Sequence, residues 1–178
     1  MGDIMLDTYM WGRVERISPE APVPIVAVER KEEGIGGAGN VAVKICSLGA
    51  AAAVLKVTGN DEDGHALKKM FAERGIDTAF VLQSDKRITT NKIRVIGRNQ
   101  QMMRLDHEVT VGLGYEDENR MILAVQHYIA QEKPQVMILE DYNKGVLTEL
   151  VIQKVIDLCR HHHIIVAVDP KRKNFFTY

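Results

Sequence analysis

The sequence predicts an α/β fold in which helices flank a mostly parallel sheet and a small β-sheet projects as a lid. From Gly37 onward, short apolar runs alternate with segments of helical period, which is typical of parallel strands joined by helices. Two other segments, residues 9–33 and 88–107, lack a helical stripe and favour antiparallel ribbons. The chain has 178 residues, enough for one substantial core, so we expect one domain made of a body and a lid.

The spacing of apolar residues along the sequence predicts the helices and strands of the body. Ile122, Val125 and Ile129 fall on one stripe of a helix. After Pro134 a continuous apolar run follows, as in a strand that is buried on both faces. The same reasoning predicts strands at residues 51–58, 136–139 and 164–168, and helices at residues 63–74, 115–131 and 148–161.

The two lid ribbons are predicted from the alternation of apolar and polar residues and from the positions of the prolines. Residues 9–33 carry prolines among apolar residues and show no helical period. Within residues 88–107, Ile93 and Val95 alternate with Lys92 and Arg94, and the chain turns near residues 97–99. Such ribbons cover a ligand as a lid or pair with a second subunit.

Composition excludes several classes of protein. Lysine plus arginine (23) nearly balances aspartate plus glutamate (24), so bulk charge gives no support for nucleic-acid binding. No apolar stretch is long enough for a membrane span and residues 1–7 lack a secretory pattern, so we expect a cytoplasmic protein. Cys46 and Cys159 lack the spacing of a zinc or redox site, and the consecutive residues 161–163, all histidine, point in different directions, so we expect no metal site.

The glycine-rich segment at residues 34–39 (GIGGAG) has two interpretations. It fits G-x-G-x-x-G before a helix-forming run at residues 40–48, and Asp61 stands where a ribose-binding acid would end the next strand. An NAD(P)-binding oxidoreductase domain of the Rossmann type is therefore one hypothesis. However, the charged residues 29–33 occupy the place where an apolar strand should run into the first glycine.

The second interpretation places another ligand at the same turn. Glycines let the backbone approach a ligand closely, and the following helix offers free N–H groups. Asn40, at the predicted helix start, could hydrogen-bond a hydroxyl of that ligand, or it could only cap the helix. Both readings of Asn40 stay open on the residues alone.

Several segments together resemble the ribokinase-like, or PfkB, carbohydrate kinases. They are residues 2–7 (GDIMLD), 36–40 (GGAGN) and 141–145 (DYNKG). Residues 16–24 (RISPEAPVP), 98–101 (RNQQ) and 104–106 (RLD) are similar to the branch of that family that phosphorylates heptose 7-phosphate for the lipopolysaccharide core and ADP-heptose synthesis. The resemblance covers essentially the whole chain in order, and it implies a ribokinase-like fold of which this chain is the N-terminal part.

The resemblance implies a role for each matching residue. Asp7, Gly36, Gly37 and Asn40 would contact the sugar. A sugar phosphate requires a basic group, for which the candidates are Lys92, Arg94, Arg98 and Arg104; each could instead lie on a solvated strand face. Four residues after the later strands would lie near the transferred phosphate and the nucleotide: Asp141 beside the substrate, Lys144 as a phosphate contact, and Asp169 and Lys171 on the nucleotide side.

The resemblance also implies cofactors and partners. The reaction would use ATP and Mg²⁺, and the lid strands would build a homodimer. The family's Gly-Ala-Gly-Asp motif, which supplies the catalytic aspartate and an anion hole, is absent, since residues 37–40 end in asparagine. We therefore expect this chain to supply sugar recognition and the lid but not to transfer phosphate alone. A non-catalytic sugar-binding or dimerisation module stays an alternative.

Overall fold

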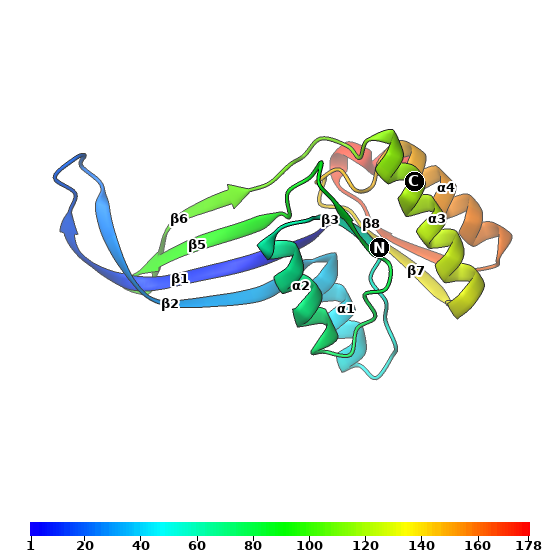
Figure 1. The fold of residues 1–178 in the computed structure, drawn as a ribbon, viewed down its shortest axis with the longest axis horizontal. Helices are drawn as coiled ribbons and strands as arrows, with labels where there is room; N and C mark the ends of the chain where they lie inside the picture. Colours follow the sequence, from blue (N-terminus) through cyan, green and yellow to red (C-terminus); the bar gives the residue numbers. More distant parts are fainter.

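The chain folds into an α/β body from which a long, narrow sheet projects (Figure 1). The structure is a computed structural model that describes residues 1–178. Its strands are β1 (Ile4–Ile17), β2 (Pro24–Gly37), β3 (Lys56–Gly59), β4 (Val81–Ser84), β5 (Asn91–Gly97), β6 (Gln100–His107), β7 (Val136–Glu140) and β8 (Ile165–Asp169). Its helices are α1 (Ala38–Ser47), α2 (Glu62–Ala72), α3 (Tyr115–Glu132), α4 (Glu149–His161) and a 3₁₀ helix, η1 (Arg172–Thr177).

The projecting sheet, called the lid here, has the strand order β2-β1-β5-β6. β1 pairs with β2, and β5 with β6, in antiparallel ladders, so the two predicted ribbons are confirmed. The sequence did not indicate that β1 and β5 pair in parallel, from Leu6 opposite Asn91 to Gly12 opposite Gly97. The β5–β6 turn lies at Arg98 and Asn99, which both have positive φ (50° and 61°).

The body contains two separate pairs of parallel strands, β3–β4 and β7–β8. One apolar core joins residues of β3 and β7 to the inner faces of α3 and α4, and a second joins β1, α1 and α2. The strand predicted at residues 51–58 is shorter than expected: only an isolated bridge at Ala53 precedes Lys56. β4 was not predicted, because its four residues are too few to show a period.

Local sequence signals set the ends of the helices. The Asp61 side chain accepts a hydrogen bond from the Gly64 N–H at 2.8 Å and so caps α2. Thr148 caps α4 through the Val151 N–H. α3 ends at Glu132, and the Lys133 that follows has a φ of 46° and precedes Pro134. None of the helices is long and apolar enough to cross a lipid bilayer.

Candidate functional site

The candidate site lies where β1 passes from the body into the lid, and Asp7 is its first element. An Arg94 Nη1–H donates to Asp7 Oδ1 at 2.7 Å, and both side chains are 21% exposed. Gly36 lies against this pair, and its lack of a side chain is required there, since a Cβ at that position would overlap the Asp7 carboxylate. The Arg94 guanidinium also lies over the Tyr9 ring. The carboxylate is thus held in one orientation while it keeps some exposure.

Three of the four predicted basic residues share a lid face with Asp7. Lys92 stands opposite Asp7 in the β1–β5 register, and Arg94 stands opposite Arg104 in the β5–β6 register. Arg94 is paired with Asp7, and Arg104 with Asp106, whereas Lys92 makes no ion pair and no side-chain hydrogen bond. We call this surface the Asp7 face.

Arg98 is not brought to Asp7. It follows Gly97, whose partner Gly12 lies about 17 Å along β1 from Asp7 at the usual rise per residue. There Arg98 donates to the Val14 carbonyl at 2.9 Å and stabilises the distal part of the lid. This position does not support the sequence-based prediction that Arg98 meets the same ligand as Asp7.

The glycine turn leads from β2 into α1. Gly37 precedes the helix with a φ of 59°, and a Cβ there would overlap the Asp3 carbonyl. The helix begins at Ala38, whose N–H donates to the Asp3 carbonyl at 3.0 Å. Asn40 therefore lies inside the first turn and is not the cap; its side chain is exposed and forms no hydrogen bond within the protein. It is thus available to a ligand.

Asp3 organises the second half of the site, and the sequence analysis missed it. Its side chain is fully buried and accepts hydrogen bonds from the backbone N–H groups of Tyr142 (2.9 Å), Lys144 (2.9 Å) and Val146 (3.3 Å). The carboxylate thus fixes the loop after β7, which spans residues 141–148. A charged residue directly before the apolar start of β1 was the available signal.

The predicted residues of this loop have partners within the protein. The Lys144 ammonium donates to Glu108 Oε1 at 2.8 Å, and these side chains are 17% and 20% exposed. Asp141 is 4% exposed and accepts hydrogen bonds from Asn174 Nδ2 (2.7 Å) and the Tyr178 hydroxyl (3.0 Å). Both groups are therefore engaged, and a ligand would have to compete with these partners.

The two nucleotide-side candidates lie at the end of β8. Asp169 stands opposite Glu140 in the β7–β8 register, and its carbonyl accepts from the Asp141 N–H at 3.1 Å. The Lys171 ammonium lies 5.5 Å from the centre of the Tyr142 ring. These contacts bring Asp169 and Lys171 to the same edge as the residue 141–148 loop.

Buried charges lie beneath the site. Burial lowers the pKa of Lys56 to about 7, although Asp3 partly opposes this. Burial also lowers the pKa of Arg87, whose guanidinium donates to the carbonyls of Val111 (3.0 Å) and Lys144 (2.6 Å). Burial, followed by the negative charges of Glu140, Asp169 and Asp7, raises the pKa of the Tyr142 phenol.

Comparison with known proteins identifies the family to which the chain is similar. The family model described as pfkB family carbohydrate kinase matches residues 1–177. The chain is 43% identical over 180 residues to the bifunctional protein HldE of Geobacter metallireducens, and 39% identical over 180 residues to that of Helicobacter pylori J99. All of this chain is covered, but only 36% and 38% of those relatives, so the chain spans little more than a third of their length.

Solved structures show the same fold. A putative phosphofructokinase from Staphylococcus aureus superposes with a TM-score of 0.77 at 10% identity, covering 98% of this chain and 53% of the other. Phosphofructokinase-2 from Escherichia coli superposes with a TM-score of 0.73 at 17% identity, covering 98% and 54%. Ribokinase from Arabidopsis thaliana gives 0.66 at 12% identity, covering 95% and 51%. The predicted ribokinase-like α/β fold is confirmed.

Proposed function

Since the chain belongs to the pfkB family of carbohydrate kinases, we propose that it forms the sugar-binding part of a heptose kinase. The complete kinase would transfer the γ-phosphate of ATP to the anomeric hydroxyl of D-glycero-D-manno-heptose 7-phosphate, a step toward ADP-heptose and the lipopolysaccharide core. The relatives named HldE support this sugar, and the heptose-kinase segments at residues 16–24 and 98–106 support it further.

The observation that carries the proposal is the restrained carboxylate of Asp7 beside Gly36. A carboxylate accepts hydrogen bonds from two sugar hydroxyls, and these bonds are stronger than those between neutral groups. The Arg94 bond at 2.7 Å fixes one oxygen, Oδ1, which leaves Oδ2 on the side where Gly36 has no Cβ. We assign Asp7, Gly36, Gly37 and Asn40 to the sugar and Arg94 to the positioning of Asp7.

The phosphate of the sugar would meet the basic residues of the Asp7 face. Lys92 supplies a cation without a protein partner, and the planar guanidinium of Arg104 suits a phosphate if it releases Asp106. Lys144 would contact the transferred phosphate only after leaving Glu108. The binding of a dianion beside Lys144 would supply the energy for that exchange.

The chain alone is proposed to be inactive because it holds no candidate for the catalytic aspartate of the Gly-Ala-Gly-Asp motif. No group of three or more histidine, cysteine, aspartate or glutamate side chains is arranged to bind a metal ion, so we assign no Mg²⁺ ligands to these residues. Asp169 and Lys171 are proposed to lie on the ATP side of the site.

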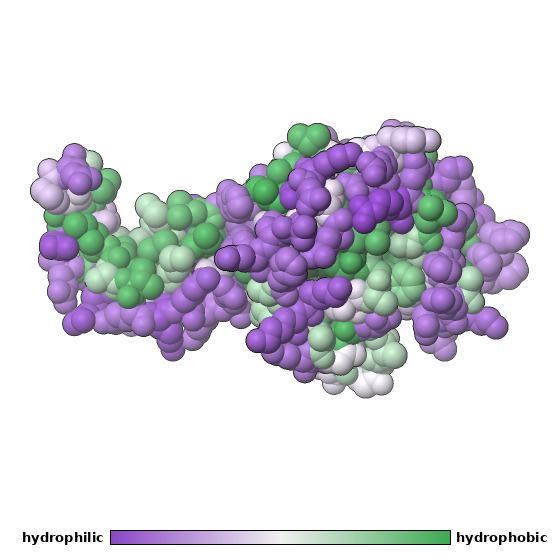
Figure 2. All heavy atoms as spheres, viewed as in Figure 1, coloured by the Kyte–Doolittle hydropathy of each residue, from purple (hydrophilic) through white to green (hydrophobic).

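The opposite face of the lid supports a homodimer. Met10, Ile93, Val95, Met103 and Leu105 alternate with the residues of the Asp7 face, and Met103 and Leu105 are 53% and 51% exposed. We call this surface the Val95 face; apolar residues on the lid are visible in Figure 2. A second lid that packed on it would cover this apolar area.

The proposal is tested by titrating the chain with heptose 7-phosphate in a calorimeter. We expect Asp7→Asn to weaken binding at least about tenfold, because it loses hydrogen bonds to a charged group. Asp157→Asn, which changes an exposed carboxylate on α4, serves as the control and should bind normally. Equal affinity of the Asp7→Asn variant and the unaltered chain would refute the role of Asp7.

Three further measurements distinguish the alternatives: the same titration with NAD, an activity assay of the chain, and a titration of the parent protein. Binding of NAD in preference to the sugar phosphate would favour the oxidoreductase hypothesis. Turnover of ATP and heptose 7-phosphate by the chain alone, at the rate of a complete kinase, would contradict the missing catalytic base. Sugar binding by a parent protein that lacks Gly-Ala-Gly-Asp would favour a non-catalytic module.

A further inference from the structure

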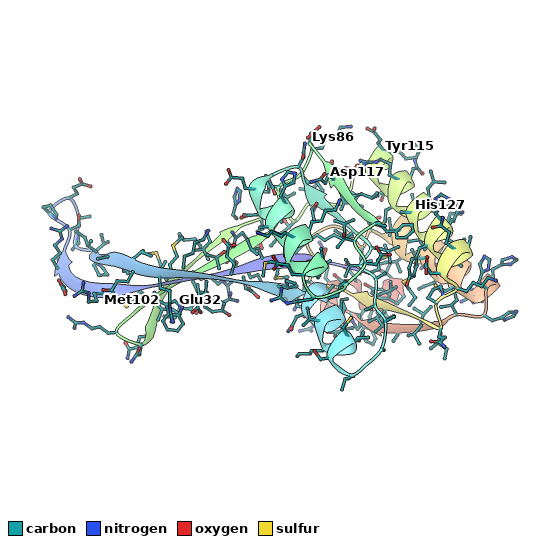
Figure 3. The ribbon with its side chains drawn as sticks, turned by 60° about the horizontal axis from the view of Figure 1, so that its bottom comes forward. Glu32, Lys86, Met102, Tyr115, Asp117 and His127 are labelled. Carbon is teal, nitrogen blue, oxygen red and sulfur yellow. The ribbon has the colours of Figure 1, made fainter.

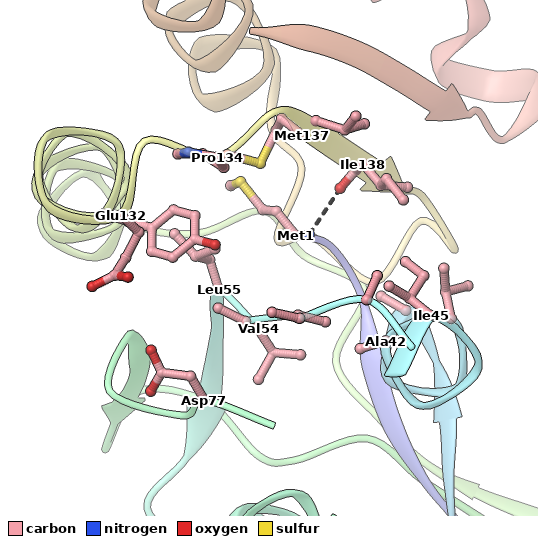
Figure 4. A pocket seen from close by; sticks show the side chains of 18 of the residues that line it. Met1, Ala42, Ile45, Val54, Leu55, Asp77, Glu132, Pro134, Met137 and Ile138 are labelled. Carbon is pink, nitrogen blue, oxygen red and sulfur yellow. Dashed lines mark hydrogen bonds between the residues drawn. The ribbon is translucent and has the colours of Figure 1, made fainter. Parts of the chain in front are cut away.

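The charged interior of the body lies apart from its largest cavity. That cavity, about 640 Å³, has a mostly hydrophobic lining from α1, β7 and residues 50–55 (Figure 4), so it does not suit a phosphate. None of its lining residues belongs to the residue 141–148 loop. That loop is held instead by two charged side chains, Asp3 and Arg87, which both bind its backbone.

Arg87 bridges the loop that carries Lys144 and the segment that joins β6 to α3, residues 108–114. Its guanidinium donates to the Lys144 carbonyl at 2.6 Å on one side. On the other side it donates to the carbonyls of Val111 and Val109, at 3.0 Å and 3.5 Å. All three acceptors belong to the backbone, so the planar guanidinium fixes two chain segments relative to each other.

Lys144 is bonded to charged side chains through all three of its polar groups. Its N–H donates to Asp3 Oδ2 at 2.9 Å, its carbonyl accepts from Arg87 Nη2 at 2.6 Å, and its ammonium donates to Glu108 Oε1 at 2.8 Å. The first two bonds fix the backbone, whereas the third holds only the end of a flexible four-carbon side chain. The ammonium can therefore change partner while the backbone stays in place.

The partner of this ammonium is held by the same guanidinium. Glu108 belongs to the residue 108–114 segment, whose carbonyls Arg87 binds. The same segment also contacts the loop directly, because the Leu113 N–H donates to the Gly145 carbonyl at 3.0 Å. The two backbones that carry the ion pair are therefore held at a fixed separation, with the guanidinium between them.

We propose that Arg87 is a positioning residue for phosphoryl transfer. It holds the Lys144 backbone so that the ammonium passes from Glu108 to the transferred phosphate without a movement of the loop. Groups that are oriented in advance lower an activation barrier, because no part of the chain has to reorganise at the moment of reaction. This role rests on the proposed contact of Lys144 with the phosphate; Arg87 acts through Lys144 and does not itself touch the substrate.

The test is a double-mutant cycle in the complete kinase with heptose 7-phosphate as the acceptor. Arg87→Lys keeps the charge but loses the planar fork, so we expect kcat to fall at least about tenfold while the KM for the sugar phosphate changes by less than about twofold. In a Lys144→Met background, the same change should lower kcat by less than about twofold, because the group that it positions is absent. Arg74→Lys is the matched control: Arg74 also donates to a carbonyl, that of Met70 at 2.8 Å, but it lies just after α2 and should leave kcat unchanged.

A second measurement follows the backbone of the chain itself. Arg87→Lys should speed hydrogen exchange of the Lys144 amide at least about fivefold, whereas the Val151 amide in α4 should exchange at the same rate as before. If Arg87→Lys does not fold, Arg87→Gln, which keeps an N–H donor group without the charge, is carried through both measurements.

Three outcomes would overturn the proposal. Equal losses of kcat in the two backgrounds would show that Arg87 acts on the fold and not through Lys144. A higher KM with an unchanged kcat would assign Arg87 to sugar binding. Unchanged exchange of the Lys144 amide would show that the guanidinium does not hold this backbone. Failure of the proposed function gives a different result: if the unaltered kinase rejects heptose 7-phosphate but uses another sugar phosphate, the proposed sugar is wrong, and the same cycle with that sugar decides the role of Arg87.

Discussion

The lid and the body have the same kind of backbone ladder but different means of stabilisation. In the body, α3, α4, β3 and β7 bury an apolar cluster of 15 residues, and β1, α1 and α2 bury one of nine. In the lid, every residue of β6 is exposed, and side chains extend from the strands without a covering layer (Figure 3). Hydrogen bonds therefore hold the lid in shape, while apolar burial stabilises the body. A sheet whose outer strand is exposed along its whole length is suited to cover ligands or a second subunit.

The largest effect on stability is expected from removal of the Asp3 side chain, which connects the start of β1 to the residue 141–148 loop. Asp3→Ala leaves three backbone N–H groups without their charged acceptor, at about 1.5–3 kcal/mol each. We expect urea denaturation to show a loss of about 5 kcal/mol or more in the free energy of unfolding. Asp3→Asn, which keeps one acceptor oxygen, should lose less, and equal losses would show that the hydrogen bonds are not the cause.

Phe71 tests the smaller core of the body. It is 2% exposed, and its ring contacts the position of Gly39 in α1. Phe71→Ala should cost about 3–5 kcal/mol in unfolding free energy because it leaves a cavity. A loss below about 1 kcal/mol would mean that α1 and α2 pack more loosely than the structure shows.

Lys56 gives a prediction of pH dependence. Its pKa is about 7 in the folded protein, against 10.5 for a solvated lysine, so between these values the unfolded chain binds more protons. Stability should therefore rise as pH increases from 7 toward 10, by up to about 1.4 kcal/mol per pH unit from this group. Lys56→Met should remove that slope, and chemical denaturation at pH 7, 8 and 9 measures it. The same slope in both proteins would contradict the burial of this amine.

The smallest effect is expected on the Val95 face of the lid. Met103→Ala should change the unfolding free energy of the monomer by no more than about 0.5 kcal/mol, because the side chain is 53% exposed. If the proposed homodimer forms, the effect should grow with protein concentration, and sedimentation should show weaker association. An effect of several kcal/mol at low concentration would mean that the lid contains a core of its own.

Patterns that act over a few residues predicted much of the fold. Alternation identified β5 and β6, and the apolar stripe of Ile122, Val125 and Ile129 identified α3 to within one residue. The same signals could not show that β1 continues from the body into the lid or that it pairs with β5. Those pairings join residues more than 80 positions apart, and no local period records them.

The candidate site was predicted in part. The motifs supplied Asp7, the glycine turn and the residue 141–145 segment, and three of the four basic candidates share a face with Asp7. Asp3, Arg87 and Glu108 were missed because their partners lie tens of residues or more away in the sequence. Lys56 did leave a signal, since a lysine interrupts the apolar run at residues 51–58.

The continuity of β1 has a mechanical consequence. Asp3 immediately precedes β1 and binds the residue 141–148 loop, whereas Asp7 lies within β1 and binds Arg94 of the lid. Any tilt of the lid is therefore transmitted as a displacement of the same backbone that anchors that loop. A displacement of the lid and an adjustment of the residue 141–148 loop are therefore coupled through the backbone of residues 3–7.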